Sequence, residues 1–296
     1  MTMPDDLQLS VIIASYNSRS TMERCLESLR SQKTSASFET IVVDSSADGT
    51  ASFVEKMFPE VTLYKFSERK YCGDARNLAV SVAKGEIIAF IDADCVVNTG
   101  WVDEILKAHQ SADLAIGGAI ANMEPSNLAG WAGYFCEFSQ WMPKTPETFL
   151  DDVAGASMSY KRRVFEEHGE FIGGTYCSDT HFHWRLAGHG HRIRFVPSIE
   201  VHHHSIDDFR RLMRHEYDHG RSFARVRVLG KRFSKLRRSI YAAFCFLIPV
   251  KLFAEIGMRN LRNRVYAAAF LKSTPLLIPC LVSWSVGECA GYIRGN

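Results

Sequence analysis

The stretch that decides the fold is Glu86-Ile-Ile-Ala-Phe-Ile-Asp-Ala-Asp94, an apolar run that ends in two carboxylates one residue apart. Residues 87–91 predict a strand buried on both faces, as in a parallel sheet covered by helices. Asp92 and Asp94 would then lie at the carboxyl end of that strand, where open α/β sheets bind their ligands. Side chains two residues apart on a strand point the same way, so both carboxylates can reach one divalent cation. The alternative for an isolated Asp-x-Asp is a polar turn after a core strand.

The chain before this stretch alternates between strands and helices. The predicted strands are 9–15, 39–44 and 61–65, and the predicted helices are about 20–29, 50–57 and 74–83. Gly85 follows the last helix, where we expect a left-handed cap residue. This order predicts an α/β fold whose central sheet is mostly parallel.

Length and composition set broad bounds. The 296 residues can hold one large α/β domain with an appendage, or two domains. A hydrophobic content of 46% and a charged content of 23% are typical of a globular protein. Eight scattered cysteines without a C-x-x-C indicate neither a disulfide framework nor a zinc knuckle. The first six residues lack the basic and apolar regions of a signal peptide, so we expect the catalytic part to stay in the cytoplasm.

The predicted sheet lacks the usual phosphate-binding motifs. The turn after the first strand, Ala14-Ser-Tyr-Asn-Ser18, has no G-x-G-x-x-G, and the chain has no G-x-x-x-x-G-K-[ST]. A nucleotide bound here needs another way to neutralise its diphosphate. A metal ion held by Asp92 and Asp94 would provide it.

Several blocks of the chain resemble those of family 2 glycosyltransferases, which have the GT-A fold. The first blocks, in order, are Ser10-Val-Ile-Ile-Ala-Ser-Tyr-Asn17, Ile41-Val-Val-Asp44, Asp48-Gly-Thr50, Ala75-Arg-Asn77 and Ile91-Asp-Ala-Asp94. The later blocks are Gly155-Ala-Ser-Met-Ser-Tyr-Lys-Arg162, Ser178-Asp179, Arg185-Leu186 and Phe195-Val-Pro-Ser-Ile-Glu-Val-His-His-His204. The resemblance covers about residues 8–205, and we expect a member of the bacterial, membrane-associated type.

The resemblance implies a binding site for a nucleotide diphosphate sugar. Its donor-binding residues would be Ser15, Tyr16, Asn17, Asp44, Arg76, Asp92 and Gly155. Asp44 would accept a hydrogen bond from the base, Tyr16 would stack on the base, and Arg76 would bind base or phosphate. Gly155 belongs to the small-residue segment beside the donor sugar. The alternatives are a capping Asp44, a packed Tyr16 and a surface Arg76.

The resemblance also implies a metal ion and a general base. Asp92, Asp94 and His203 would bind Mn²⁺ or Mg²⁺, with Asp94 the direct ligand and Asp92 touching the ribose or the metal's surroundings. Asp179 would take the proton of the acceptor hydroxyl. The chain departs from the family's Glu-Asp pair because Ser178 replaces the Glu. His181 and His183 could then help to tune Asp179, or they could be ordinary polar positions.

Three consecutive histidines, 202–204, also suggest a metal site. On an extended strand His202 and His204 share one face and His203 points to the other, so all three cannot bind one ion unless the chain bends. A solvated strand end is the alternative for this run.

The last ninety residues have a different character. Residues 210–238 are rich in Arg and Lys, and two apolar stretches follow at 240–250 and 275–287. Each is shorter than the roughly 20 apolar residues of a spanning helix. If both stretches spanned a membrane, the loop that joins them would lie outside. That loop carries Arg259, Arg262 and Arg264, which conflicts with the positive-inside rule. We expect an interfacial or re-entrant hairpin at an anionic membrane surface. The alternative is a helical subdomain packed on the sheet; no base-reading motif supports nucleic acid.

These observations predict a GT-A catalytic domain at 1–205 and a helical, membrane-associated region at 206–296. The predicted activity is inverting, metal-assisted transfer of a sugar from a nucleotide diphosphate donor to a glycan or lipid-linked acceptor in polysaccharide biosynthesis. The predicted location is the cytoplasmic face of a bacterial inner membrane. The alternatives are a nucleotidyltransferase on a related sheet, and a non-catalytic membrane scaffold with a relic nucleotide-sugar fold.

Overall fold

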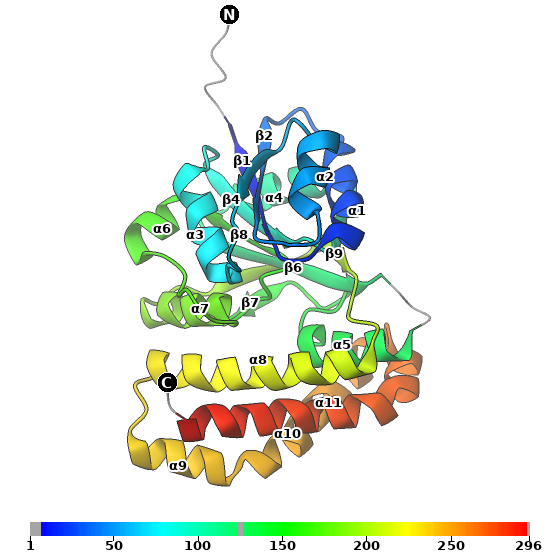
Figure 1. Ribbon diagram of the computed structural model, residues 1–296, viewed down its shortest axis with the longest axis vertical. Helices are drawn as coiled ribbons and strands as arrows, with labels where there is room; N and C mark the ends of the chain where they lie inside the picture. The colour runs from blue at the N-terminus through cyan, green and yellow to red at the C-terminus, as the bar shows by residue number, and fades with distance from the viewer. Residues whose placement is uncertain (1–6, 124–126, 295–296) are drawn as a thin grey trace, which may run out of the picture. The chain divides into compact units, whose positions relative to one another are not determined.

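The computed structural model describes residues 7–123 and 127–294, which group into two compact units. Unit 1 comprises Met1–Ala121, Pro146–Gly174 and Ser178–His203, and unit 2 comprises Asn122–Thr145, Thr175–Cys177 and His204–Asn296. The β-sheet belongs to unit 1, whereas unit 2 is mainly helical (Figure 1). Unit 2 therefore draws residues from within the predicted catalytic domain, and the division at residue 205 stays a prediction.

The sheet has nine strands in the described part of the chain. Their order is β3-β2-β1-β4-β8-β6-β9-β5, and β7 pairs with β9 outside this path. The strands are β1 (Leu9–Ser15), β2 (Phe38–Asp44), β3 (Thr62–Lys65), β4 (Ile87–Asp92), β5 (Cys95–Val97), β6 (Ala115–Asn122), β7 (Thr148–Leu150), β8 (Met158–Lys161) and β9 (Ile193–His203).

The first half of the sheet is parallel, as the sequence predicts. β1 lies between β2 and β4, and the apolar runs 11–13, 41–43 and 87–91 of these strands are buried because helices cover both faces. The register pairs Ser15 with Asp44 and Ala14 with Asp92. The parallel pairing therefore brings the ends of three strands, with their polar residues, to one edge of the sheet.

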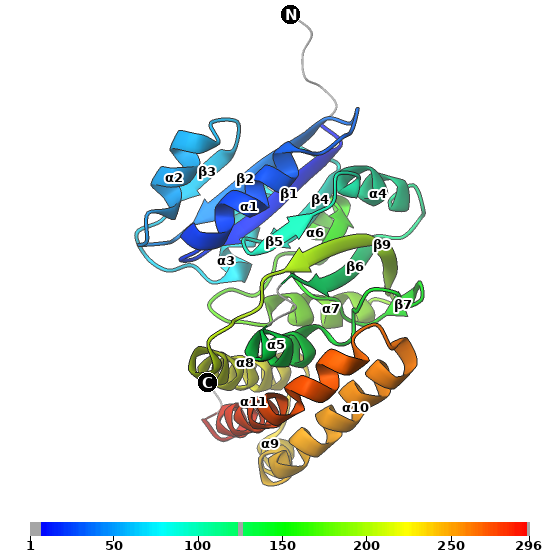
Figure 2. The ribbon, with the colours of Figure 1, turned by 90° about the vertical axis from the view of Figure 1, so that its right-hand side faces the viewer.

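The second half of the sheet contains antiparallel pairs. β8 pairs antiparallel with both β4 and β6. β5 pairs antiparallel with β9, and these two strands are neighbours in Figure 2. The predicted α/β fold class is confirmed, but the sheet is mixed. Antiparallel pairing has a functional result, because the β5–β9 register places Cys95 opposite His203.

Six helices of unit 1 surround the sheet in the described residues. They are α1 (Arg19–Arg30), α2 (Thr50–Met57), α3 (Cys72–Val82), α4 (Trp101–Ala108), α6 (Arg163–His168) and α7 (Ser178–Gly188). The prediction of a left-handed cap at Gly85 is wrong, because Gly85 is not among the residues with positive φ. Gly85 is instead required by space: a Cβ there would lie 2.5 Å from the backbone of Leu9 and Ser10 in β1.

Unit 2 contains the remaining helices. They are α5 (Leu128–Phe138), α8 (Phe209–Gly230), α9 (Lys235–Ala243), the 3-10 turn η1 (Cys245–Leu247), α10 (Ile248–Asn263) and α11 (Ala267–Arg294). α8 and α11 run side by side (Figure 1), and Gly291 of α11 leaves no room for a side chain against the backbone of Arg221. The buried Glu288 of α11 forms an ion pair with Arg227 and accepts a hydrogen bond from Tyr292. The predicted C-terminal helices are therefore present, and they pack closely on each other.

Candidate functional site

Asp44 is buried at the end of β2 and is held by three hydrogen bonds. Its Oδ1 accepts from the hydroxyls of Ser15 and Ser46, each at 2.6 Å, and its Oδ2 accepts from the backbone N–H of Ser46 at 3.2 Å. A carboxylate oxygen has two lone pairs, so Oδ2 can still accept one more hydrogen bond. The predicted donor residues Ser15 and Asp44 thus lie together at the edge of the parallel half.

The loop after β1 is tied to the loop after β2 through Asn17. Its backbone N–H donates to Ser46 Oγ at 2.6 Å, and its Oδ1 accepts from the N–H of Ala47 at 3.2 Å. Asn17 adopts a left-handed conformation, φ 54°, which Asn tolerates better than most residues. These bonds order the loop and leave the ring of its neighbour Tyr16 43% exposed.

Arg69 is a residue of this edge that the sequence analysis missed. Its guanidinium carbon lies 4.4 Å from the ring centroid of Tyr16 and 5.0 Å from that of Tyr71. An Arg stacked on an exposed aromatic ring presents a positive, planar surface. No motif marks Arg69, because it acts through a loop contact with Tyr16 and not through a fixed spacing.

Asp92 and Arg76 form a salt bridge. Arg76 Nη2 donates to Asp92 Oδ1 at 3.2 Å, and the side chain of Arg76 is only 5% exposed. Burial raises the pKa of the Asp92 carboxyl, and the charge of Arg76 opposes that rise. Arg76 lies on α3 and is buried against Asp92 at the end of β4, which excludes the alternative of a surface Arg76.

Gly155 and Asp179 meet beside this salt bridge. Asp179, in the first turn of α7, accepts at Oδ2 from the N–H of Gly155 at 2.8 Å and at Oδ1 from the N–H of Thr180 at 3.0 Å. A Cβ at position 155 would lie 2.8 Å from both Arg76 Nη1 and Asp179 Oδ2. The structure therefore brings together Arg76, Asp92, Gly155 and Asp179, and only glycine fits between them.

His183 belongs to a buried group of its own. Its Nδ1 lies 2.5 Å from Asp152 Oδ1, and its Nε2 lies 2.5 Å from the hydroxyl of Tyr160. Because the carboxylate can only accept, Nδ1 donates to Asp152. The suggestion that His183 tunes Asp179 directly is thus not supported by a contact. His183 instead holds Asp152 in place. Asp152 lies three residues before Gly155, the residue that donates to Asp179.

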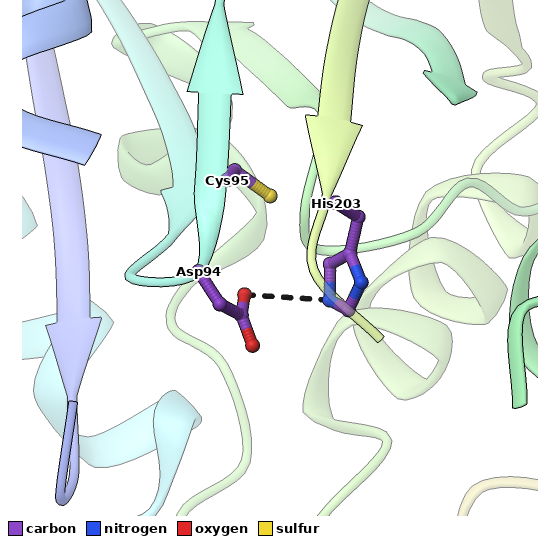
Figure 3. Close-up of side chains that lie close together, drawn as sticks. All are labelled: Asp94, Cys95 and His203. Carbon is purple, nitrogen blue, oxygen red and sulfur yellow. Dashed lines mark ion pairs between the residues drawn. The ribbon is translucent and has the colours of Figure 1, made fainter. Parts of the chain in front are cut away.

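Asp94 lies in the turn between β4 and β5. The strand therefore ends before Asp94, and the expectation that the side chains of Asp92 and Asp94 point the same way does not hold. The β5–β9 pairing brings His203 to Asp94, and Nε2 of His203 lies 3.3 Å from Asp94 Oδ1. The dashed line in Figure 3 marks this ion pair. Asp94 Oδ1 is buried and accepts no hydrogen bond in the described residues. A buried carboxylate oxygen without a hydrogen bond calls for a cation.

The ligand atoms of Asp94, Cys95 and His203 lie within 4.8 Å of one another. A carboxylate oxygen and an imidazole nitrogen suit Mn²⁺, whereas a thiol is a soft ligand. Burial raises the pKa of the Cys95 thiol well above its usual range, which disfavours the thiolate. Asp94 and His203 therefore fit a divalent cation. Asp92 is not part of this group, and its place as a shared metal ligand stays a prediction.

A mixed sheet with polar residues at the edge of its parallel strands, beside an Asp–His pair that fits a cation, agrees with the GT-A fold of nucleotide-sugar-dependent glycosyltransferases. Residues 10–169 match the profile of the family described as glycosyl transferase family 2. The chain belongs to this family, which confirms the predicted family and enzyme class.

Two relatives and one solved structure show how far the similarity extends. The protein EpsH of Bacillus subtilis is 34% identical over 54% of this chain, and the matched region spans 48% of EpsH. Glycosyltransferase AglE of Haloferax volcanii is 23% identical over 97% of each chain. The mannosyltransferase PcManGT of Pyrobaculum calidifontis, solved with GDP-Man and Mn²⁺, is 19% identical, with a TM-score of 0.64 over 95% of this chain and 86% of its own. The likeness to PcManGT shows the GT-A fold.

Proposed function

We propose that this chain is an inverting glycosyltransferase that uses a divalent cation to transfer a sugar from a nucleoside diphosphate. The observation that carries the proposal is the pair Asp94–His203 beside the group formed by Arg76, Asp92 and Asp179. The Asp94–His203 pair would hold the cation that neutralises a diphosphate leaving group. Asp179 would remove a proton from an acceptor.

Asp94 and His203 would hold Mn²⁺ or Mg²⁺. The bound ion would supply a Lewis acid for the negative charge that develops on the leaving phosphate oxygens. The PcManGT complex with GDP-Man and Mn²⁺ supports this proposal by showing that the same fold holds such an ion with its donor. Arg76, which is positive, buried and paired with Asp92, would add charge stabilisation.

The nucleotide would lie along the edge formed by β1 and β2. Asp44 Oδ2 would accept a hydrogen bond from the base, since it has a free lone pair. Tyr16 and Arg69 would provide a flat aromatic and guanidinium surface for stacking. Asn17 and Ser15 would act by holding this surface in place, because their hydrogen bonds tie the two loops together.

Asp179 would be the general base. A single displacement inverts the sugar carbon, so the base must lie on the opposite side from the leaving group. The bonds from the N–H groups of Gly155 and Thr180 fix the position of the carboxylate. Each oxygen keeps a lone pair for the acceptor hydroxyl. The acceptor would be a glycan or a lipid-linked sugar.

Unit 2 carries the proposed membrane attachment. The helix α11 is long and apolar enough to cross a membrane, but 44% of its apolar window is buried. Its neighbour α8 carries Arg210, Arg214 and Arg221, so the pair cannot enter a hydrocarbon layer together. Large apolar side chains are nevertheless exposed on unit 2, namely Leu236, Ile240, Phe244, Phe246, Leu247, Val250, Met258, Leu261, Leu271 and Ile293. Apolar residues among Arg and Lys favour attachment to the surface of an anionic membrane.

The test is direct product analysis. The purified chain with Mn²⁺ would be incubated with a panel of nucleotide sugars and a short-chain lipid-linked sugar, and products identified by mass spectrometry. We expect sugar transfer from one donor, and a product of inverted anomeric configuration by NMR. Retention of configuration would exclude Asp179 as the base of a single displacement. Nucleotidyl transfer in place of sugar transfer would overturn the proposal.

A further inference from the structure

The long helix α8 of unit 2 contains the sequence His215-Glu216-Tyr217-Asp218-His219, which has the form H-E-x-x-H. Residues four apart on a helix lie on the same face, one turn above the other. The ring centroids of the two histidines are 5.5 Å apart, so both face the same region. On a helix, this spacing is the one with which two histidines bind a single zinc ion.

A third ligand comes from a different helix. Glu137 of α5 places Oε1 at 3.2 Å from His215 Nε2. The ligand atoms of Glu137, His215 and His219 all lie within 4.8 Å of one another. All three side chains are partly buried, which leaves a route for an ion and for a water molecule. Two imidazoles and one carboxylate are a known donor set for Zn²⁺.

Aromatic side chains enclose the cluster. The ring of Tyr176 lies 5.8 Å from that of His215 and 5.9 Å from that of His219, measured between centroids. Trp284 of α11 lies 4.9 Å from His219. Rings on two sides hold the imidazoles in one orientation, and preorganised ligands bind a metal more tightly.

Glu216 provides a second observation that points to a cation. It follows His215 directly, it is fully buried, and neither of its carboxyl oxygens accepts a hydrogen bond in the described residues. A buried carboxyl group without partners is unfavourable unless positive charge or a proton compensates it. Glu137 adds another carboxylate to the same helical unit. A divalent cation nearby would offset this negative charge.

We propose that Glu137, His215 and His219 form a zinc-binding site that clamps α5 to α8 within unit 2, with water as the fourth ligand. Mg²⁺ and Mn²⁺ are weaker candidates, because two of the three ligands are imidazoles. The site is structural. Glu216 occupies the position of the base in zinc peptidases, but its complete burial keeps substrates away from it.

The experiment uses the full chain carrying Asp94→Asn, so that the Asp94–His203 pair contributes little metal binding. After EDTA treatment and dialysis, Zn²⁺ is titrated by calorimetry, and Co²⁺ is titrated with its visible absorption as the readout. We expect one tightly bound Zn²⁺ per chain, a strong tetrahedral Co²⁺ spectrum, and a rise in melting temperature with Zn²⁺.

In this background His219→Gln should weaken zinc binding by at least about 100-fold, since even outer-shell substitutions commonly reduce metal affinity by about 10–100-fold. The melting temperature of the zinc-free protein should change little, which separates lost binding from lost folding. His202→Gln, which removes a partly exposed histidine paired with Glu200 in unit 1, is the control and should leave binding unchanged. The proposal is overturned by absence of Zn²⁺ binding in the Asp94→Asn chain, or by equal affinity after His219→Gln.

Discussion

Oδ2 of Asp179 accepts a hydrogen bond of 2.8 Å from the backbone N–H of Gly155. The two residues come from segments that are separate in sequence, and Arg76 packs against the same glycine. The group proposed to remove the acceptor proton is therefore positioned by the segment proposed to lie beside the donor sugar. Small displacements of that segment should affect catalysis.

Gly155→Ala should reduce kcat/KM by up to about 100-fold, because displacing a catalytic group by about 1 Å has an effect of that size. The added Cβ would lie 2.8 Å from Arg76 Nη1 and from Asp179 Oδ2, so both must move. Steady-state kinetics measures the loss. Gly188→Ala is the control, since a Cβ there meets no atom within 4 Å. Unchanged kinetics in both variants would show that Gly155 does not hold the site.

Asp94→Asn should lower the transfer rate by about 100-fold or more, because a Lewis acid contributes several kcal/mol to charge stabilisation. The variant should also lose the enhancement of nucleoside diphosphate binding by Mn²⁺, measured by calorimetry. Asp151→Asn, which removes an exposed carboxylate, is the matched control. Full activity of the unmodified protein in EDTA would contradict the metal assignment.

Asp179→Asn should leave donor affinity within a few-fold and reduce kcat by about 10²- to 10⁴-fold, the usual contribution of a general base. The amide oxygen can still accept the N–H of Gly155, so the loop should keep its position. Donor affinity and single-turnover rate are to be measured on the same preparation. A loss of donor affinity with unchanged turnover would assign Asp179 to the donor site.

His109 should make unit 1 less stable in acid. Burial, assisted by the charge of Lys161, lowers the pKa of His109 to about 3, and its Nε2 lies 2.9 Å from Ser159 Oγ. Between pH 6.5 and 3 the unfolded chain binds the extra proton and the folded chain does not, so stability falls as pH falls. The loss between pH 7 and pH 5 should be about 2 kcal/mol.

Urea unfolding at the two pH values measures this loss. In His109→Gln the pH-dependent part should be smaller by about the same 2 kcal/mol. The exposed His189 provides the control variant His189→Gln, which should keep the pH dependence of the unmodified protein. An identical pH dependence in His109→Gln would show that His109 does not control it.

Membrane attachment should resist salt. Each basic residue near an anionic surface contributes about 1 kcal/mol, which salt screens, whereas apolar burial is not screened. The full chain should therefore stay on anionic vesicles in high salt. The double substitution Phe246→Ser and Val250→Ser, at side chains that are 68% and 69% exposed, should make release salt-dependent. Phe149→Ser, in unit 1, is the control. If the full chain does not bind anionic vesicles at any salt concentration, the proposed membrane attachment of unit 2 is wrong.

The sequence by itself determined the parallel half of the sheet. The apolar runs within β1, β2 and β4 are buried on both faces. Short continuous apolar runs that alternate with amphipathic helices are typical of parallel strands buried in this way. The ends of those strands were predictable for the same reason, because parallel strands place their carboxyl ends at one edge. Asp44 and Asp92 lie there as expected.

Tertiary structure alone decided how the polar side chains are paired. Asp92 contacts Arg76 and Asp94 faces His203, although the two carboxylates are one residue apart, because the chain turns at residues 93–94. The contacts of His183 with Asp152, and of Glu137 with His215, join segments whose spacing carries no signal. Local sequence sets the period with which side chains are buried. Antiparallel pairing and helix packing bring residues that are distant in sequence close together. A polar contact depends on this proximity in space and not on sequence separation.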